Sequence, residues 1–399
     1  MRMSFFMARI AGCGLETRGI GALPLMKKLA GSGDRINRDS PGLRRFPENG
    51  LSLSMQGEDV GWMRRAMDEA RKGVGRTAPN PPVGAVVVKD GVEIGAGWHR
   101  GAGLPHAERE AMAAVRSTLG EDVLRGSSVY VTLEPCSTHG RTPPCTEGLI
   151  EAGVARVIYA AEDPNPAHAG GADALLAAAG IAVTRGVLAE EAARLIRPFA
   201  KVQRCGLPWV ILKTAMSLDG RITRPPGEGM WLTGPEARAE VQRLRAEVEA
   251  IVTSGETVRK DRPRLDLRDP ELAAGRAQPW RVVLTANPNN LPKDAPLFTD
   301  ANRQRTLIES RDPPEEVLRK LVTERGVSAV LVECGGRLAA SLLEAGLVDE
   351  WVAFLAPMLC GGPVPALAGE GFPDGLRLRQ PEFRRFGSDV MLRAEVLRD

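Results

Sequence analysis

The sequence predicts two α/β domains in series. At 399 residues the chain is longer than one ordinary domain and long enough for two separate cores. Predicted strands alternate with predicted helices along most of its length, which is typical of sheets covered by helices. The helical pattern breaks at Arg204–Pro208, just before a new strand begins at Trp209. We therefore place the boundary between the two domains at this segment.

The elements of the first half follow from apolar spacing and turn residues. Apolar residues at helical spacing from Val60 to Ala70 predict a first helix, with Asp59 as its cap. Two strands, at 83–88 and 92–98, flank an Asp-Gly step that supplies the positive φ of a tight hairpin turn. The predicted elements that follow are a helix at 106–118, a strand at 128–133, a helix at 145–152, a strand at 156–161, a helix at 171–179, a strand at 181–187 and a helix at 189–202.

The second half again predicts alternating strands and helices. Helices are expected at 235–248, 314–325 and 337–345. The predicted strands are 209–216, 250–254, 280–285, 305–309, 328–333, 350–356 and a final pair near 377–397 around the Gly387-Ser388 turn. No internal repeat or low-complexity tract interrupts this order.

The composition argues against several classes of protein. The chain has 43% hydrophobic and 26% charged residues, as an average soluble globular protein has, and only 4% aromatic residues. Its net charge of +3 creates no global field that would favour nucleic acid or an anionic membrane. Apolar runs are too short to cross a bilayer. We therefore expect a small-molecule substrate, with neither nucleic acid nor a membrane as a partner.

The number of cysteines and the composition of the first 54 residues indicate in which cellular compartment the protein works. The six cysteines lack the density of a disulfide scaffold, so a reducing compartment, the cytoplasm, fits best. Residues 1–54 contain nine Lys or Arg against four Asp or Glu, without sustained periodicity. That composition suits a targeting peptide, a flexible tail or translation begun upstream of a true start at Met55. We expect this extension to be disordered or not translated, and exclude it from the fold prediction.

A candidate catalytic zinc site lies in the first half. His106 and Glu108 open a predicted helix, Cys136 follows a predicted strand and Cys145 begins the next helix. One imidazole and two thiolates supply three ligands and leave the fourth tetrahedral position open for water. Glu108 can then act as the catalytic proton shuttle beside that water. The pattern resembles the H-x-E…P-C-x-x-C signature of zinc deaminases, except that the cysteines are nine positions apart rather than three.

The structural alternative for these residues is that the histidine and the free cysteines simply pack in the fold. Four chemically matched residues at strand and helix ends favour the metal site. His139 lies between the cysteines, but His106 already fills the imidazole position, so a substrate-facing or solvated role is favoured for it. His99 and His168 have no metal partner in the sequence and are interpreted as polar loop residues.

Three further motifs make a family resemblance specific. They are Asn80-Pro-Pro-Val-Gly84, the loop from Pro135 to Cys145 and Asp163-Pro-Asn-Pro166. With these motifs the chain resembles the bifunctional pyrimidine deaminase/reductases of riboflavin biosynthesis, from about Val60 to the C-terminus. The long inter-cysteine loop is the most diagnostic part of this resemblance.

The resemblance implies a fold and an activity for each half. Residues 55–203 would form a cytidine-deaminase-like α/β/α domain, and residues 208–399 a dihydrofolate-reductase-like α/β domain that uses NADPH. The first would deaminate a diaminopyrimidinone that carries ribose 5-phosphate, and the second would reduce the ribosyl group to ribityl. His106, Cys136 and Cys145 would bind one zinc ion, with Glu108 as the proton shuttle.

In the second half the resemblance rests on Lys213–Arg221, Trp231–Gly234 and Thr257–Asp261. A glycine pair at Gly335 and Gly336 also precedes a helix, where backbone amides can approach an anion, although a tight turn explains such a pair about as often. Carried over by position, the resemblance places NADPH near Ala215, Trp231, Thr257, Asp261, Gly335, Gly336, Arg337, Leu338, Ala339, Ala340 and Ser341.

The implied substrate contacts of the reductase are Arg245, Leu265, Arg268 and Glu333. The two arginines suit a phosphate because guanidinium groups pair with it through two hydrogen bonds. The alternative for Arg245 is a solvated helix face, since it lies in a charged run. Lys213, Asp219 and Glu333 are all left as candidates for the general acid.

Four departures from the family pattern are present, and one of them is Arg262, which replaces the second Asp usual after Asp261. Ala169-Gly-Gly-Ala172 lacks the basic residue usual there, and Gly229 and Ala286 stand where substrate- and cofactor-binding serines are common. Gly229 and Ala286 motivate the alternative of a deaminase whose reductase half has decayed into a scaffold. A second alternative is a nucleic-acid deaminase with an accessory domain, which the balanced charge disfavours. For the bifunctional enzyme we expect a homo-oligomer.

Overall fold

The computed structural model describes residues 53–139, 143–165, 170–224, 228 and 231–397. Contacts divide the chain into two compact units, Met1–Gly50 and Leu51–Asp399, and every described residue belongs to the second. The predicted N-terminal extension therefore lies outside the described residues, apart from residues 53 and 54, which open the first helix. Within the described part of the chain, no helix combines the length and the apolar composition needed to cross a membrane.

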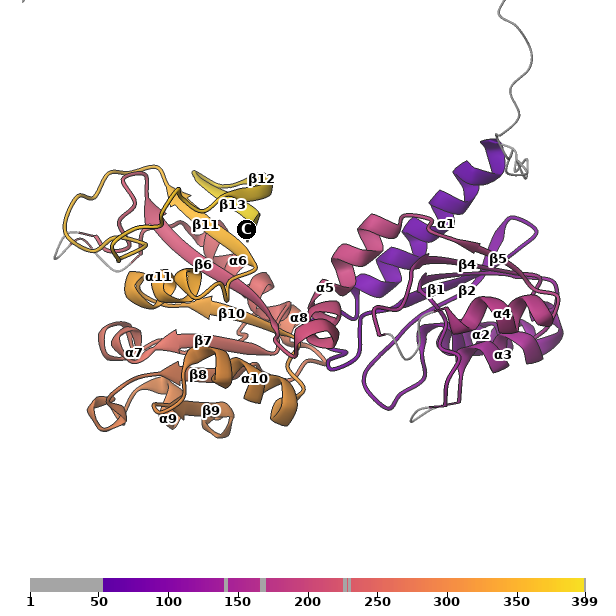
Figure 1. Ribbon diagram of the computed structural model, residues 1–399, viewed down its shortest axis with the longest axis horizontal. Coiled ribbons are helices and arrows are strands. Elements are labelled where there is room, and N and C mark those ends of the chain that lie inside the picture. Colours follow the sequence, from indigo (N-terminus) through magenta and orange to yellow (C-terminus); the bar gives the residue numbers. More distant parts are fainter. Residues whose placement is uncertain (1–52, 140–142, 166–169, 225–227, 229–230, 398–399) are drawn as a thin grey trace, which may run out of the picture. The chain divides into compact units, whose positions relative to one another are not determined.

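A mixed five-stranded sheet organises the first half of this unit (Figure 1). Its order is β2-β1-β3-β4-β5, antiparallel where β1 meets β2 and β3, and parallel from β3 to β5. The carboxyl ends of β3 and β4 consequently lie side by side at one edge. The strands are β1 (Gly84–Lys89), β2 (Val92–Trp98), β3 (Ser128–Leu133), β4 (Arg156–Ala161) and β5 (Ala182–Arg185).

Helices cover both faces of this sheet. A Cβ on Gly84 would lie 2.2 Å from a carbonyl of α1, and one on Gly97 would lie 2.5 Å from a backbone nitrogen of α2. Gly84 pairs with Trp98, the neighbour of Gly97, so the two glycines face opposite sides and the two helices pack on opposite faces. The helices are α1 (Leu53–Arg71), α2 (Ala107–Leu119), α3 (Cys145–Glu151), α4 (Gly171–Ala178) and α5 (Ala189–Cys205), with a 3₁₀ turn at Glu121–Leu124.

The predicted hairpin between β1 and β2 is confirmed. Asp90 and Gly91 have φ angles of 51° and 73°, both in the left-handed region that such a tight turn requires. The turn sets the register that pairs Lys89 with Val92.

An eight-stranded sheet organises the second half, in the order β12-β13-β11-β6-β10-β7-β8-β9. The strands from β11 to β9 are parallel, and β13 and β12 extend one edge antiparallel. The strands are β6 (Trp209–Ser217), β7 (Ala250–Ser254), β8 (Trp280–Leu284), β9 (Thr306–Glu309), β10 (Ala329–Glu333), β11 (Glu350–Ala356), β12 (Leu378–Phe386) and β13 (Asp389–Val396).

Both faces of the second sheet are buried. Along β6, Val210 and Leu212 belong to one apolar core and Ile211 to the other, as the two-residue period of a strand requires. One core receives side chains from α10 and α11, and the other from α6 and α7. The helices are α6 (Pro235–Ala246), α7 (Gly255–Asp261), α8 (Pro270–Ala273), α9 (Pro296–Thr299), α10 (Pro314–Arg325) and α11 (Gly336–Glu344), with 3₁₀ turns at Pro288–Asn290 and Arg303–Arg305.

Candidate functional sites

The three expected zinc ligands converge at the carboxyl end of β3. Their ligating atoms all lie within 4.8 Å of one another. His106 Nδ1 is 3.4 Å from Cys136 Sγ and 3.3 Å from Cys145 Sγ. A tetrahedral zinc ion with bonds of about 2.0 to 2.3 Å needs donors roughly 3.5 to 3.8 Å apart. The donor set and its spacing therefore fit a zinc ion.

Backbone hydrogen bonds explain how two cysteines nine positions apart meet. The Cys145 N–H donates to Cys136 Sγ at 3.2 Å, and the Thr146 N–H donates to the Cys136 carbonyl at 3.2 Å. Arg109 of α2 donates to the Pro144 carbonyl at 2.8 Å and so ties the loop to the helix that carries His106. Residues 140–142 within this loop lie outside the described residues.

The electrostatics of the three donors suit a cation. The hydrogen bond with the Cys145 thiol lowers the pKa of Cys136 to about 4. The same bond, together with burial, raises the pKa of Cys145. The hydrogen bond with Cys136 raises the pKa of His106 despite its partial burial. The hydrogen bond between the two sulfurs thus lowers the pKa of one thiol and raises that of the other, and a zinc ion would bind both as thiolates.

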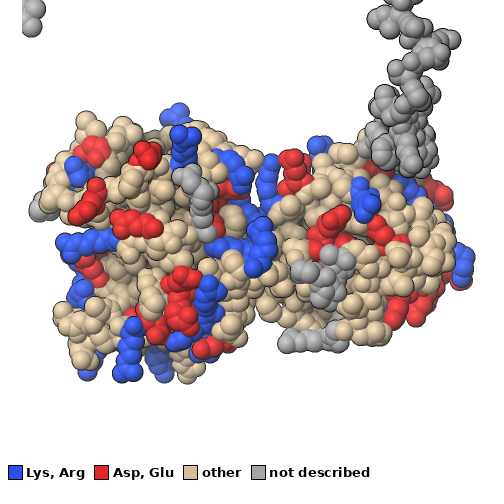
Figure 2. All heavy atoms as spheres, in the orientation of Figure 1, with Lys and Arg blue, Asp and Glu red and all other residues tan. Residues whose placement is uncertain are grey.

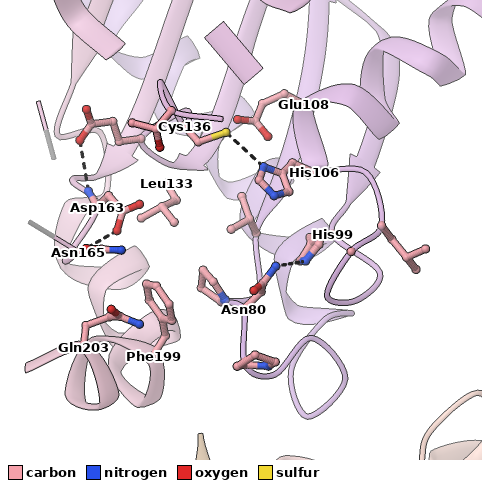
Figure 3. A pocket seen from close by; sticks show the side chains of 17 residues that line it. Asn80, His99, His106, Glu108, Leu133, Cys136, Asp163, Asn165, Phe199 and Gln203 are labelled. Carbon is pink, nitrogen blue, oxygen red and sulfur yellow. Dashed lines mark hydrogen bonds between the residues drawn. The ribbon is translucent and has the colours of Figure 1, made fainter. Parts of the chain in front are cut away.

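Glu108 lies in the first turn of α2, two residues beyond His106. It is only 3% exposed, and burial raises the pKa of its carboxyl group. Figure 3 shows its side chain beside His106 and Cys136. A carboxylate with a raised pKa suits a group that takes up a proton and gives it back during a reaction.

A pocket of about 440 Å³ opens in front of these residues (Figure 3). Its walls include the expected zinc ligands His106 and Cys136, and Glu108. Other polar or aromatic side chains that line it include Asn80, His99, Asp163, Asn165, Phe199 and Gln203. Of these six further residues, Asn80, Asp163 and Asn165 belong to motifs that the sequence singled out. The pocket thus gathers side chains from elements far apart in the chain.

His99 follows β2 in a loop, as expected, and it is also a buried residue that lines the pocket. It is 2% exposed, and its Nδ1 lies 3.0 Å from the Pro105 carbonyl, which can only accept a hydrogen bond. Nδ1 therefore carries the proton, and Nε2 accepts the bond that Asn80 Nδ2 donates at 2.9 Å. Burial lowers the pKa of His99, in keeping with a neutral ring. His99 consequently fixes the orientation of the Asn80 amide.

Glu134 holds the opposite wall of the pocket. Its buried carboxylate accepts the Asp163 N–H at 3.3 Å and the Ala172 N–H at 3.4 Å. Asp163 in turn accepts the Asn165 N–H at 2.8 Å, and Figure 3 draws both the Asp163 and the Asn165 bonds. The residue just before Pro135 therefore sets the position of the loop that carries the third sequence motif.

The other histidines are placed as follows. His139 is largely exposed and pairs with Glu147 at 3.0 Å, which agrees with a solvated role and not with a metal ligand. His168 lies outside the described residues, as does Ala169, the first residue of the step that lacks the usual basic side chain.

The second half brings the expected substrate residues around one buried ion pair. Arg245, near the end of α6, donates to the two Glu333 oxygens at 2.7 and 3.1 Å, and to the Asp266 carbonyl at 3.0 Å. Lys213 Nζ lies 4.0 Å from the same carboxylate. Burial opposes ionisation of Glu333, but the charges of Arg245 and Lys213 outweigh it, so its pKa is lowered. Arg245 is 7% exposed, which excludes the solvated helix face considered as its alternative.

Arg268 and Leu265 flank this ion pair. Arg268 lies 3.7 Å from Asp266, is about half exposed and adds to the lowered pKa of Glu333. Leu265 is 2% exposed and its side chain packs in the apolar core. The Arg268 side chain is therefore accessible to solvent beside the buried ion pair, whereas the Leu265 side chain is buried in the core.

Two helices begin at the carboxyl ends of neighbouring parallel strands, where the expected cofactor residues lie. Helix α11 begins at Gly336 after β10 and α7 begins at Gly255 after β7, and these strands are parallel neighbours. A Cβ on Gly336 would lie 2.4 Å from the Pro365 carbonyl, and one on Gly255 2.5 Å from Thr285, so only glycine fits at either start. Thr257 donates its N–H to Ser254 at 3.1 Å. The pair of N-termini suits the phosphates of a dinucleotide such as NADPH.

The side chains of the remaining expected cofactor residues differ in their exposure to solvent. Trp231 is 59% exposed and lies under the Arg238 guanidinium. Ala339 and Ala340 pack their side chains in the core. The exposed residues are Arg337 and Ser341 on α11 and Asp261 on α7. Gly335, Leu338 and Ala215 are partly exposed. Of the departures in this half, Ala286 after β8 is exposed and Gly229 lies outside the described residues.

Comparison with known proteins decides the family. The model of the cytidine and deoxycytidylate deaminase zinc-binding region matches residues 57–161, and that of the RibD C-terminal domain matches residues 208–392. The riboflavin biosynthesis protein RibD of Escherichia coli K12 is 39% identical over 366 residues, which cover 84% of this chain and 98% of that protein. The chain belongs to the RibD family. The expected order of a deaminase domain followed by a reductase domain is confirmed.

Other RibD proteins support the same assignment. The Haemophilus influenzae RibD is 41% identical over 334 residues, 77% of this chain and 88% of that protein. A solved Acinetobacter baumannii RibD structure has a TM-score of 0.77 at 35% identity and covers 86% of this chain and 100% of that one. A Thermotoga maritima structure, described as a diaminohydroxyphosphoribosylaminopyrimidine deaminase/5-amino-6-(5-phosphoribosylamino)uracil reductase, has a TM-score of 0.75 at 34% identity and covers 86% and 100%.

RibD membership and the two matched domains make the chain a bifunctional enzyme of riboflavin biosynthesis, with a zinc-dependent deaminase domain and an NADPH-dependent reductase domain. The comparisons lend no support to a nucleic-acid deaminase or to a decayed reductase scaffold.

Proposed function

We propose that the first domain deaminates 2,5-diamino-6-(5-phosphoribosylamino)pyrimidin-4-one and that the second reduces the ribosyl chain of the product to ribityl. The observation that carries the proposal is the convergence of His106, Cys136 and Cys145 beside the buried Glu108. The Thermotoga maritima relative, which carries both activities in its description, supports the choice of substrate.

For the deaminase, His106, Cys136 and Cys145 would hold the zinc ion. When bound, zinc supplies Lewis-acid activation of water for attack on the carbon that bears the amino group. Glu108 removes a proton from the attacking water and delivers it to the departing amino nitrogen. Its burial keeps the carboxyl group out of bulk solvent, so the proton stays in the pocket between the two transfers.

The pyrimidine ring would be oriented by the two walls of the pocket. The Asn80 amide, fixed by His99, offers hydrogen bonds on one side. The loop with Asp163 and Asn165, fixed by Glu134, offers them on the other. Polar groups on both edges suit a flat ring with exocyclic amino and carbonyl groups, because each edge pairs with a different set of donors and acceptors.

For the reductase, Arg245 and Arg268 would contact the phosphorylated substrate beside Glu333. NADPH supplies the hydride when bound, and the N-termini of α11 and α7, at Gly336 and Gly255, would hold it. Lys213 is our candidate for the proton donor, because its ammonium group lies 4.0 Å from Glu333 and its partial burial lowers its pKa.

Asp219 is a poorer general acid than Lys213. Its carboxylate accepts a hydrogen bond from Ser217 and the N–H groups of Cys360 and Gly361, at 3.0 and 2.6 Å. The Ser217 bond is the largest of the effects that lower the pKa of Asp219 to about 2. It is therefore ionised at neutral pH and anchors the loop around residue 360.

The test uses the purified, zinc-loaded full chain. Ammonia release from the diaminopyrimidinone phosphate and NADPH consumption on the deaminated product should both be observed. A protein that performs neither reaction would contradict the proposal. Titration with NADPH tests the alternative of a decayed reductase. Micromolar binding by the wild type that is lost in Asp261→Ala or Trp231→Ala requires a working cofactor site. Absence of binding by the wild type favours the decayed scaffold.

We also propose that the enzyme is a cytoplasmic homo-oligomer. The sparse cysteines, and the free thiols among those that the structure describes, suit a reducing compartment. Sedimentation of the purified protein at several concentrations measures the oligomeric state, and a monomer at all of them would contradict that part of the proposal.

A further inference from the structure

Helix α5 contributes one wall of the deaminase pocket through two side chains outside every motif. Phe199 and Gln203 line the pocket, and they lie four residues apart, on one face of the helix. Phe199 is half-buried and Gln203 is exposed. In Figure 3 they lie at the end of the pocket away from Glu108 and Cys136. This end of the pocket can therefore contact a part of the ligand that lies away from the expected zinc ligands.

The same helix is anchored through its other face. Arg197 pairs with Glu350 at 2.7 Å and with Glu395 at 3.0 Å. Lys201 pairs with Asp349 at 2.5 Å, and both of those side chains are less than 10% exposed. Positions two apart on a helix point about 200° from each other, so the ion pairs and the pocket side chains lie on nearly opposite faces.

The ion pairs make α5 a fixed wall. Removing one partner of a buried ion pair leaves an uncompensated charge, so such pairs resist separation. The Arg197 guanidinium also stacks 4.6 Å from the Trp209 ring at the start of β6. The ion pairs therefore fix the position of α5, so that Phe199 and Gln203 can contact a ligand without a large movement of the helix.

The chemistry of the substrate says which part reaches this wall. This step rests on the proposed deamination, in which the amino group on C2 of the ring faces Glu108 and the metal ligands. The phosphoribosylamino group is on C6, on the far side of ring atom N1, and so extends away from the metal centre. An aromatic ring packs against the apolar face of a sugar, and an amide supplies both a donor and an acceptor to its hydroxyl groups.

We propose that Phe199 and Gln203 form the ribosyl subsite of the deaminase and give it specificity for a ribosylated pyrimidine. They act on the part of the substrate that does not react. Their loss therefore weakens recognition of the sugar while Glu108 and the metal ligands continue to work on the ring.

The experiment compares two substrates in the full, zinc-loaded chain. One is the phosphoribosyl diaminopyrimidinone and the other is 2,5,6-triaminopyrimidin-4-one, which lacks the sugar. For Phe199→Ala and Gln203→Ala we expect kcat/KM on the ribosylated substrate to fall about tenfold or more, the scale of one lost pocket contact, through a raised KM. On the truncated compound kcat/KM should stay within about twofold of wild type. If its turnover is too slow to follow, its inhibition constant is compared instead.

Two controls separate contact from folding. Arg194→Ala removes an exposed α5 side chain that pairs only loosely with Glu190, at 3.7 Å, and should change neither substrate. Reductase turnover in the same chains should match wild type. Equal losses on both substrates, or no loss on either, would overturn the subsite. A wild-type protein that fails to deaminate the ribosylated compound would instead overturn the proposed function.

Discussion

Arg245 and Glu333 form a two-point ion pair at 2.7 and 3.1 Å in which both side chains are close to fully buried. The pair joins the end of α6 to the end of β10, next to the start of α11. A buried guanidinium held by one carboxylate depends on that carboxylate, because an unpaired buried charge costs about 3–5 kcal/mol. The arrangement ties the residues proposed to contact the substrate to those proposed to hold NADPH.

The first prediction concerns this pair. Glu333→Gln keeps the shape of the side chain and removes its charge, so Arg245 and Lys213 lose their common counter-ion. We expect reductase kcat/KM to fall at least tenfold while deamination in the same chain is unchanged. Steady-state rates of deamination and of NADPH-dependent reduction measure these two effects. Glu324→Gln, an exposed change on α10, should alter neither rate, and a normal reductase rate in Glu333→Gln would contradict the role given to the pair.

The second prediction separates metal binding from proton transfer. Glu108→Gln should keep one zinc per chain and lose deamination by about a hundredfold or more, since general acid–base catalysis contributes that much. Cys145→Ala should lose both zinc and deamination while NADPH oxidation survives. Metal analysis of the purified variants gives the zinc content. Full activity of Glu108→Gln would show that another group carries the proton.

The third prediction is a pH dependence of the reductase. Burial lowers the pKa of Lys213, and the nearby Glu333 only partly compensates. A proton donor is active in its protonated form, so reduction should be fastest below the pKa of Lys213 and decline as pH rises through it. Because that pKa is lowered, the decline begins at a lower pH than for a free lysine. Lys213→Arg keeps a positive charge that does not titrate, so the decline should vanish together with most of the rate.

Much of the fold was predictable because its long elements carry clear periods. The strands at 92–98, 128–133, 156–161, 250–254 and 350–356 and the helix at 314–325 have the predicted bounds, and most other long elements differ from prediction by a few residues. The first helix begins at Leu53, so Asp59 lies inside it and the prediction that it caps the helix is wrong. The short helices α7, α8 and α9 were missed. They span seven residues or fewer, so apolar spacing has no room to repeat, and α8 and α9 each begin with a proline that also marks a turn.

The convergence of the three expected zinc ligands was predictable and most of the pocket was not. His106, Cys136 and Cys145 fall at element ends that local patterns reveal, and a tetrahedral ion dictates their chemistry. The role of His99 depends on Asn80 and on the Pro105 carbonyl, and such contacts across the fold leave no local signal. Phe199 and Gln203 belong to a helix whose period was recognised, but the period shows which face is apolar and not which pocket that face meets.

The last prediction concerns Glu134, whose buried carboxylate accepts two backbone N–H groups, from Asp163 and Ala172. Glu134→Gln replaces one oxygen by an NH₂ group, which must then face a backbone donor, so one bond is lost whichever way the amide turns. The loop with Asp163 and Asn165 should shift relative to the metal ligands. We expect KM for deamination to rise by about tenfold, the effect of one lost hydrogen bond to a charged group, with little change in kcat. Zinc content and reductase turnover should match wild type, as they should for the exposed control Glu121→Gln. A loss of zinc would instead place Glu134 in the support of the metal ligands, and an unchanged KM would show that the loop holds its position without it.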